Sequence, residues 1–158
     1  MDCSKLNKGL TLIFDFDGTM CQIFKNYNLD NTIALLVEKM SSFDIKFSSE
    51  KDSFDVFEEI VKQTENKIEI RKTALNEANN ILSIAELEAV ATGEIVKGVD
   101  VIIPQLISNN IAIGISTNNS SQCVLSFLQK YMPNHIIPTV GRIGDKPELM
   151  KPNPYSIF

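Results

Sequence analysis

A chain of 158 residues has the length of one domain, or of one domain with a small insert. With 44% hydrophobic and 22% charged residues, its composition is that of an ordinary globular protein, which argues against a disordered chain, a collagen-like repeat and a disulfide scaffold. Fifteen basic against 20 acidic residues give a net charge of −5 and no basic stripe, so nucleic acid is not an expected partner.

The first predicted element is the apolar segment LTLIFDF at residues 10–16, whose length and content of Thr, Ile and Phe favour a buried parallel strand. Apolar residues at helical spacing then predict three helices, at residues 30–40, 53–63 and 68–91. Residues 21–94 contain 14 acidic and 8 basic side chains, whereas the two flanks together are close to neutral. We therefore expect this middle part to be an acidic, all-helical insert.

The remainder of the chain alternates helices and strands. Helices are predicted at residues 99–108 and 121–131, and strands at residues 111–115 and 136–140. The last strand is expected at a sheet edge, because the nitrogen of Pro138 cannot donate to a neighbouring strand. Strands that alternate with helices indicate a parallel α/β sheet with right-handed crossovers.

These patterns predict an α/β protein with two parts. Residues 1–20 and 95–158 are expected to form a Rossmann-like α/β core around the parallel sheet, and residues 21–94 a helical cap inserted into it. Because parallel sheets bind ligands at the carboxyl ends of their strands, polar clusters at those ends are the candidate functional residues.

The first polar cluster, DFDGT, closes the first strand. Asp15 and Asp17 are expected to point the same way, because side chains alternate along an extended backbone. Two carboxylates this close repel each other unless a cation or a shared proton offsets the charge, and Mg²⁺ is the natural choice for oxygen ligands. Gly18 lets the chain turn sharply after the pair.

Two further clusters complete the pattern. Thr117 and Asn118 precede the helix at 121–131 and supply a hydroxyl, an amide and backbone N–H groups, which together suit a phosphate. Lys151 lies in the sequence KPNP, where prolines restrict the backbone and can hold the ammonium group in one place. A carboxylate pair, a hydroxyl and a lysine in this order are typical of a phosphoryl-transfer site.

The motifs DFDGT after an apolar strand, Thr-Asn after a second strand, and KPNP resemble the first three motifs of the haloacid dehalogenase superfamily. The insert resembles the helical cap of its phosphoglycolate phosphatase-like and β-phosphoglucomutase-like members. The resemblance implies that Asp15 is the nucleophile, which becomes phosphorylated, and that Asp17 acts as general acid and then base. An Asp at the position of Asp17 also disfavours carbon–halogen chemistry.

The same resemblance implies that Mg²⁺ is held by the carboxylate of Asp15 and the backbone carbonyl of Asp17. Lys151 would neutralise charge on the nucleophile and on the transferring group. The candidate phosphate-binding residues are Gly18, Thr117 and Asn118.

The sequence departs from the family pattern at its C-terminal end. Relatives continue past KPxP with a further strand and an acidic fourth motif that completes the metal site, whereas no Asp or Glu follows Glu148 here. We therefore expect a truncated member with an incomplete sheet and weak Mg²⁺ binding. The absence of that strand would leave the strand at 10–16 as an open edge, through which the chain could self-associate.

The predicted function is hydrolysis of a phosphorylated metabolite. The substrate is expected to be small, because a closing cap excludes large substrates. The activity is expected to be impaired by the missing fourth motif. The alternative is a non-catalytic truncated or split remnant that binds phosphate or a partner chain. A phosphomutase or phosphonatase remains a third possibility, and a phosphonatase would need a cap lysine such as Lys25.

The N-terminal sequence MDCSKLNKG has no apolar core of signal-peptide length. The longest purely apolar runs are four or five residues, against the roughly 20 that span a membrane. Cys3, Cys21 and Cys123 match no zinc or CxxC spacing, which favours reduced structural thiols. We expect a cytoplasmic protein without membrane partners.

Overall fold

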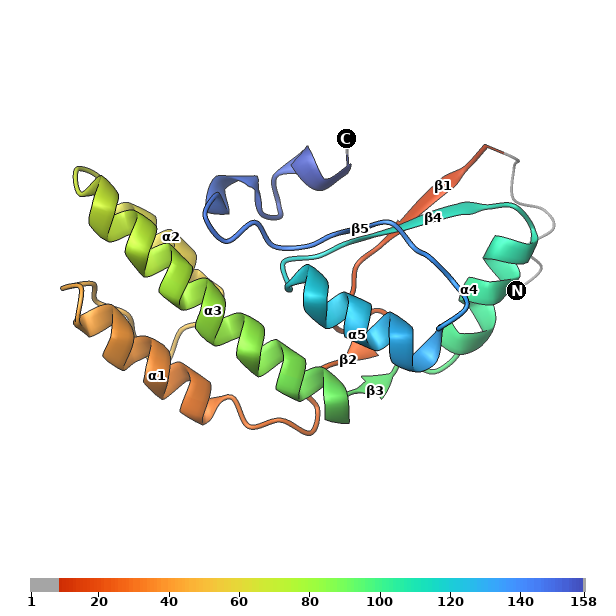
Figure 1. The fold of residues 1–158 in the computed structure, drawn as a ribbon, viewed down its shortest axis with the longest axis horizontal. Coiled ribbons are helices and arrows are strands. Elements are labelled where there is room, and N and C mark those ends of the chain that lie inside the picture. Colours follow the sequence, from red (N-terminus) through yellow and green to blue (C-terminus); the bar gives the residue numbers. More distant parts are fainter. Residues whose placement is uncertain (1–8, 158) are drawn as a thin grey trace.

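A three-stranded parallel sheet lies at the centre of the core in the computed structural model, which describes residues 9–157 (Figure 1). Its strand order is β1 (Thr11–Phe14), β4 (Ala112–Ser116) and β5 (Thr139–Val140). Leu12 lies opposite Ile113, and Phe14 lies opposite Ile115. The parallel sheet with helical connections confirms the predicted α/β, Rossmann-like class.

Two crossover helices cover one face of this sheet, α4 (Val99–Ser108) before β4 and α5 (Ser121–Tyr131) after it. Ile113 of β4 packs in one apolar core with Ile103 of α4 and Phe127 of α5. Side chains alternate between the faces of a strand, so Thr11 and Ile13 point to the opposite face. Both are exposed there, and Ile13 keeps 44% of its surface in solvent.

The insert contains three helices, which lie together on the left of Figure 1: α1 (Asp30–Ser41), α2 (Asp55–Gln63) and α3 (Ile68–Thr92). Both α1 and α2 pack against α3. They enclose a second apolar core, separate from that of the sheet, which includes Leu36, Met40, Phe57, Ile60, Ala78 and Leu82. The long helix α3 also contacts α5, and so connects the three helices to the sheet.

A short antiparallel ribbon joins the two parts of the chain. It consists of β2 (Cys21–Gln22), where the chain leaves the core, and β3 (Glu94–Ile95), where it returns. The expectation of an entirely helical insert over residues 21–94 is therefore wrong at its first two residues and at its last, Glu94. A pair of two-residue strands has no periodicity that a sequence pattern could reveal.

Two core elements are shorter than predicted. The strand expected at 10–16 is regular only over β1, because the chain turns into the loop after Phe14. The strand expected at 136–140 is reduced to β5, although Pro138 contributes its carbonyl, which accepts from the N–H of Ile115 at 2.8 Å. Its place at the sheet edge is as predicted.

The division into core (1–20 and 95–158) and cap (21–94) stays a prediction, and some side chains pack across it. Cys21 and Ile23 belong to the core under the sheet, whereas Met150 packs against the helices of the insert. The chain after β5, residues 141–157, is called the C-terminal segment, and it contains two short 3₁₀ helices, Pro147–Leu149 and Pro154–Ile157. Within residues 9–157, no helix is both long enough and apolar enough to cross a lipid bilayer.

Candidate active site

Asp15 and Lys151 meet at the carboxyl end of the sheet, although 136 residues separate them in sequence. Asp15 directly follows β1, and its side chain is 45% exposed. The chain after β5 turns back over this end of the sheet (Figure 1), so that the Nζ of Lys151 donates to Oδ1 of Asp15. The same ammonium group donates to the main-chain oxygen of Ser116, at the end of β4, at 3.1 Å. Lys151 thus bridges the ends of two neighbouring strands.

Asn118 holds the backbone of this lysine on both sides of the residue. Its Oδ1 accepts from the N–H of Lys151 at 2.8 Å, and its Nδ2 donates to the carbonyl of Lys151 at 3.2 Å. The structure therefore brings three of the sequence-predicted site residues, Asp15, Asn118 and Lys151, into one contact network. Their predicted parts in catalysis and phosphate binding stay predictions.

Asp17 lies in a different environment from Asp15. Burial raises the pKa of its carboxyl, and the N–H groups of Ile23 and Gly18 oppose this rise, while the negative charge of Asp15 adds to it. The bond from the N–H of Ile23 to Oδ1 is 3.1 Å long. Gly18 makes the turn that follows with a φ of 76°, a conformation that favours glycine, and its N–H donates to the carbonyl of Cys21 at 2.7 Å.

Thr117 is buried at the start of the loop after β4. Its hydroxyl donates to Oδ1 of Asn119 at 2.8 Å and accepts from the N–H of Asn119 at 3.1 Å. These two bonds shape the loop that leads into α5. A direct bond from this hydroxyl to a phosphate oxygen, as predicted, requires that it give up Asn119 as its acceptor.

The residues that could hold a metal are few. Among residues 9–157, no cluster of three or more His, Cys, Asp and Glu side chains could hold one. The predicted donors are the carboxylate of Asp15 and the main-chain carbonyl of Asp17, both hard oxygen ligands of the kind Mg²⁺ prefers. Mg²⁺ is commonly bound by one or two carboxylates together with substrate phosphate and water. These donors fit Mg²⁺ in that form, with phosphate as a further ligand.

A buried ion pair beside the site was not predicted from the sequence. Glu86 of α3 and Arg142, which follows β5, form a bond of 2.6 Å between Oε1 and Nη1, and both side chains are 0% exposed. Glu86 lies four residues after Leu82 and four before Val90, on the buried stripe of α3. A carboxylate on such a stripe needs a buried partner, so the position of Glu86 in the sequence could have predicted a buried ion pair.

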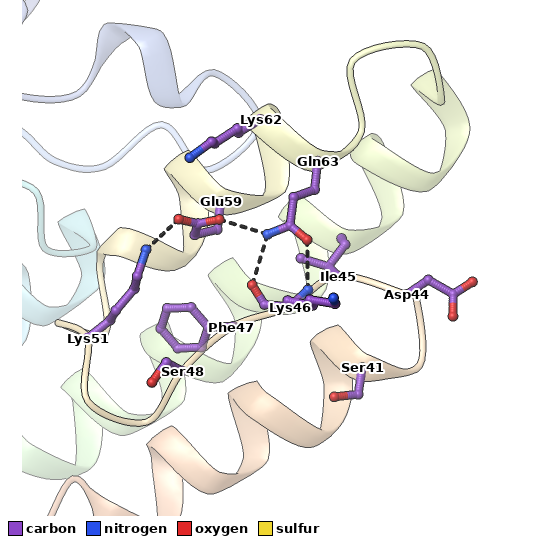
Figure 2. A pocket seen from close by; sticks show the side chains of 10 residues that line it. All are labelled: Ser41, Asp44, Ile45, Lys46, Phe47, Ser48, Lys51, Glu59, Lys62 and Gln63. Carbon is purple, nitrogen blue, oxygen red and sulfur yellow. Dashed lines mark hydrogen bonds and ion pairs between the residues drawn. The ribbon is translucent and has the colours of Figure 1, made fainter.

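A groove of about 650 Å³ opens onto the site between α2 and the C-terminal segment. Phe54, just before α2, lines this groove together with Met150, Asn118 and Lys151. A larger cavity of about 820 Å³ lies within the helical insert (Figure 2). None of the candidate residues lines that second cavity.

Four of the residues that line the larger cavity, Lys46, Lys51, Glu59 and Gln63, bind one another (Figure 2). Glu59 pairs with Lys51 and accepts from Nε2 of Gln63 at 2.7 Å. The amide of Gln63 also bonds to both the N–H and the carbonyl of Lys46, each at 2.8 Å. This network joins α2 to the loop after α1, so these polar residues are explained by their structural role.

Comparison with known proteins places the chain among hydrolases. Residues 12–158 match the model of a family described as haloacid dehalogenase-like hydrolase. A solved protein from Bacteroides fragilis, described as a haloacid dehalogenase-like hydrolase, is 18% identical with a TM-score of 0.62, and the match covers 93% of this chain and 69% of that one. A protein from Clostridium acetobutylicum, described as a predicted phosphatase, is 14% identical with a TM-score of 0.52, and the match covers 84% of this chain and 60% of that one.

At such identities these two structures show a shared fold, and this chain spans between 60% and 69% of their length. No curated protein sequence matches the chain. The family model, by contrast, matches nearly all of it, including the three motifs that carry the candidate residues. The protein therefore belongs to the haloacid dehalogenase-like hydrolase family.

Proposed function

We propose that this chain is a phosphatase that hydrolyses a small phosphate monoester through an aspartyl-phosphate on Asp15. A carboxylate oxygen of Asp15 attacks phosphorus, and the bond from phosphorus to the ester oxygen breaks. A water molecule then attacks the phosphorylated Asp15, which releases inorganic phosphate and restores the carboxylate. The contact between Lys151 and Asp15 is the observation that supports this proposal most directly, because it assembles a nucleophile and a cation at the carboxyl end of a parallel sheet.

Asp17 is the proposed acid and base. In the first step it gives a proton to the leaving ester oxygen, and in the second it takes a proton from the attacking water. Its raised pKa supports the assignment, because a carboxyl group that must donate a proton works best when its pKa lies closer to the working pH. Asp15, which is more exposed and paired with Lys151, is suited to the role of nucleophile.

Lys151 is proposed to neutralise the charge that gathers on the transferring phosphoryl group. Asn118 fixes the backbone of this lysine, and the N–H groups of the loop after β4 are proposed phosphate donors together with Gly18 and Thr117. Mg²⁺ bound by the carboxylate of Asp15 and the carbonyl of Asp17 would offset the repulsion between the nucleophile and the anionic substrate.

The groove between α2 and the C-terminal segment supports a substrate of metabolite size. We propose no nucleic-acid or membrane partner, in keeping with the net charge of −5. A cytoplasmic location is supported by Cys21 and Cys123, which are buried free thiols. Burial raises the pKa of Cys21 to about 11, so this thiol is not a nucleophile near neutral pH.

A second candidate function is a phosphate-binding module without turnover. It is favoured by the small number of metal donors among the described residues and by the hydroxyl of Thr117, which is bonded to Asn119. Such a module would bind phosphate through Lys151 and the loop after β4. It would not depend on the nucleophilicity of Asp15.

Hydrolysis of p-nitrophenyl phosphate in the presence of MgCl₂ separates the two functions. For a phosphatase, Asp15→Asn is expected to lower kcat by a factor on the order of 100 or more, because an amide cannot form the phosphorylated intermediate. Asp100→Asn, which makes the same change at an exposed position in the first turn of α4, is the matched control and should retain full activity. Equal rates for the wild type and Asp15→Asn, with inorganic phosphate still bound, would favour the binding module.

A further inference from the structure

The carboxylate of Glu86 is fully satisfied inside the protein, beside the candidate active site. Oε2 accepts from the N–H of Ser120 at 2.8 Å, and Oε1 accepts from Nδ2 of Asn119 at 3.3 Å. Arg142 donates to both oxygens, at 2.6 and 3.3 Å. Two of these partners belong to the loop that joins β4 to α5. A cap helix therefore directly holds the loop of the predicted phosphate site.

The guanidinium of Arg142 is held equally well. Its Nε donates to Oδ1 of Asn79 at 2.9 Å, and its Nη2 donates to Oγ of Ser83 at 3.0 Å, both on α3. Its Nη1 donates to the main-chain oxygen of Asn118 at 3.0 Å. A planar fork of this kind has a fixed geometry, so its bonds to α3 also fix the position of Asn118.

The network continues from Asn118 to the catalytic lysine. The backbone of Asn118 is held by Arg142, and its side chain holds the backbone of Lys151. We propose that Glu86 and Arg142 are positioning residues, which set the loop after β4 and, through Asn118, the place of Lys151 beside Asp15. The expected effect on turnover rests on the proposed phosphatase function, whereas the effect on the loop does not.

Arg142 also supports the wall of the groove. Its guanidinium carbon lies 5.7 Å from the ring centre of Phe54 and 5.4 Å from that of Phe57, and both rings line the groove that leads to Lys151. Cations within about 6 Å of an aromatic ring are attracted to its face. One side chain therefore contacts both the loop of the reaction centre and the wall that would contact a substrate.

The contacts that run from Glu86 and Arg142 through Asn118 to Lys151 are called the relay. Amide hydrogen exchange measured by NMR tests this relay without any need for turnover. Glu86→Gln keeps the size of the side chain and Arg142→Lys keeps its positive charge, but both weaken the paired geometry. Both are expected to speed up exchange of the Ser120 amide, and of the Lys151 amide as well, by about tenfold or more. Glu59→Gln is the matched control, because Glu59 pairs with Lys51 within the cap, and it should change neither amide. Faster exchange at Ser120 with an unchanged rate at Lys151 would overturn the relay.

A third variant keeps the test decisive if a change in the buried pair prevents folding. Asn118→Ala leaves Glu86 and Arg142 in place but removes both bonds to the backbone of Lys151. It is expected to speed up exchange at Lys151 and to leave Ser120 within about twofold of the wild type. An unchanged Lys151 amide in this variant would show that Asn118 does not position the lysine.

Kinetics with p-nitrophenyl phosphate give the catalytic consequence. In folded Arg142→Lys, kcat is expected to fall about tenfold or more because Lys151 is displaced, and KM to rise because the groove wall loosens. In folded Glu86→Gln, kcat should fall with a smaller change in KM. Wild-type values for both constants would overturn the positioning role. A wild-type chain without Asp15-dependent activity would overturn the phosphatase proposal instead, and the exchange rates would still decide the relay.

Discussion

Asp15 and Asp17 leave the same strand end two residues apart, yet they have opposite surroundings. The carboxylate of Asp15 is exposed and paired with Lys151, whereas that of Asp17 is half-buried and accepts from the N–H of Ile23. Burial raises the pKa of Asp17, and the nearby charge of Asp15 adds to the rise. A carboxyl group with a raised pKa beside the proposed nucleophile is the arrangement that acid–base catalysis needs.

The raised pKa predicts a pH dependence of stability. Between the ordinary pKa of an Asp and the raised pKa of Asp17, the folded state binds more protons than the unfolded state, so stability falls as the pH rises through this window. Asp17→Asn removes the ionised group while keeping an oxygen for the N–H of Ile23. At pH 7 it should be more stable than the wild type by up to about 1 kcal/mol, as is common when a functional group is neutralised.

Urea denaturation of both proteins at several pH values measures this difference. The advantage of Asp17→Asn should shrink as the pH falls and the wild-type Asp17 becomes protonated. The opposite result, a variant less stable than the wild type at pH 7, would mean that the N–H donors outweigh burial at this carboxylate.

Lys151 is predicted to act through its charge. Lys151→Met keeps the length of the side chain but removes the ammonium group that contacts Asp15 and the carbonyl of Ser116. Loss of one group that stabilises transition-state charge commonly lowers kcat by about 100-fold to 1,000-fold, and we expect a loss of this size. Lys146→Met, an exposed lysine on the same segment, is the control. A kcat of Lys151→Met within about threefold of the wild-type value would show that Lys151 takes no part in the mechanism.

The sequence was sufficient to predict elements with a clear period. The helices expected at 99–108 and 121–131 coincide with α4 and α5, and that at 68–91 differs from α3 by one residue. Apolar stripes of about ten residues or more contain enough repeats to identify a helix, but they do not fix its ends, and the helix expected at 53–63 begins only at Asp55. The ribbon of β2 and β3 was not foreseen, because two residues contain no repeat.

The same limit applies to the site. The meeting of Asp15, Asn118 and Lys151 follows from a topological rule, since the carboxyl ends of parallel strands share one edge. The buried pair does not follow from any such rule. Glu86 stands out as a charge on an apolar stripe, but Arg142 lies in an irregular segment after a two-residue strand. Only the folded chain shows that these two residues meet.

Stability measurements can show how strongly this pair is coupled. Glu86→Leu leaves the charge of Arg142 without its ion-pair partner, and Arg142→Met does the same to Glu86. Each single change should therefore lower the free energy of unfolding by about 3–5 kcal/mol. The double variant removes both charges together and should be destabilised by clearly less than the sum of the two. Urea denaturation of the four proteins completes the cycle. Additive losses would show that each residue acts through separate contacts.

The last prediction concerns the open edge of β1, which pairs only with β4 among the described strands. An edge strand exposes unpaired N–H and C=O groups, and the adjoining sheet face exposes Ile13, so we predict that the chain self-associates through this strand. A charged lysine protects an edge, and Ile13→Lys should therefore lower the average mass measured by light scattering after gel filtration. Leu125→Lys, at a 50% exposed position on α5, is the matched control and should leave the mass unchanged. A wild type that stays monomeric across a hundredfold range of concentration would rule out association through β1.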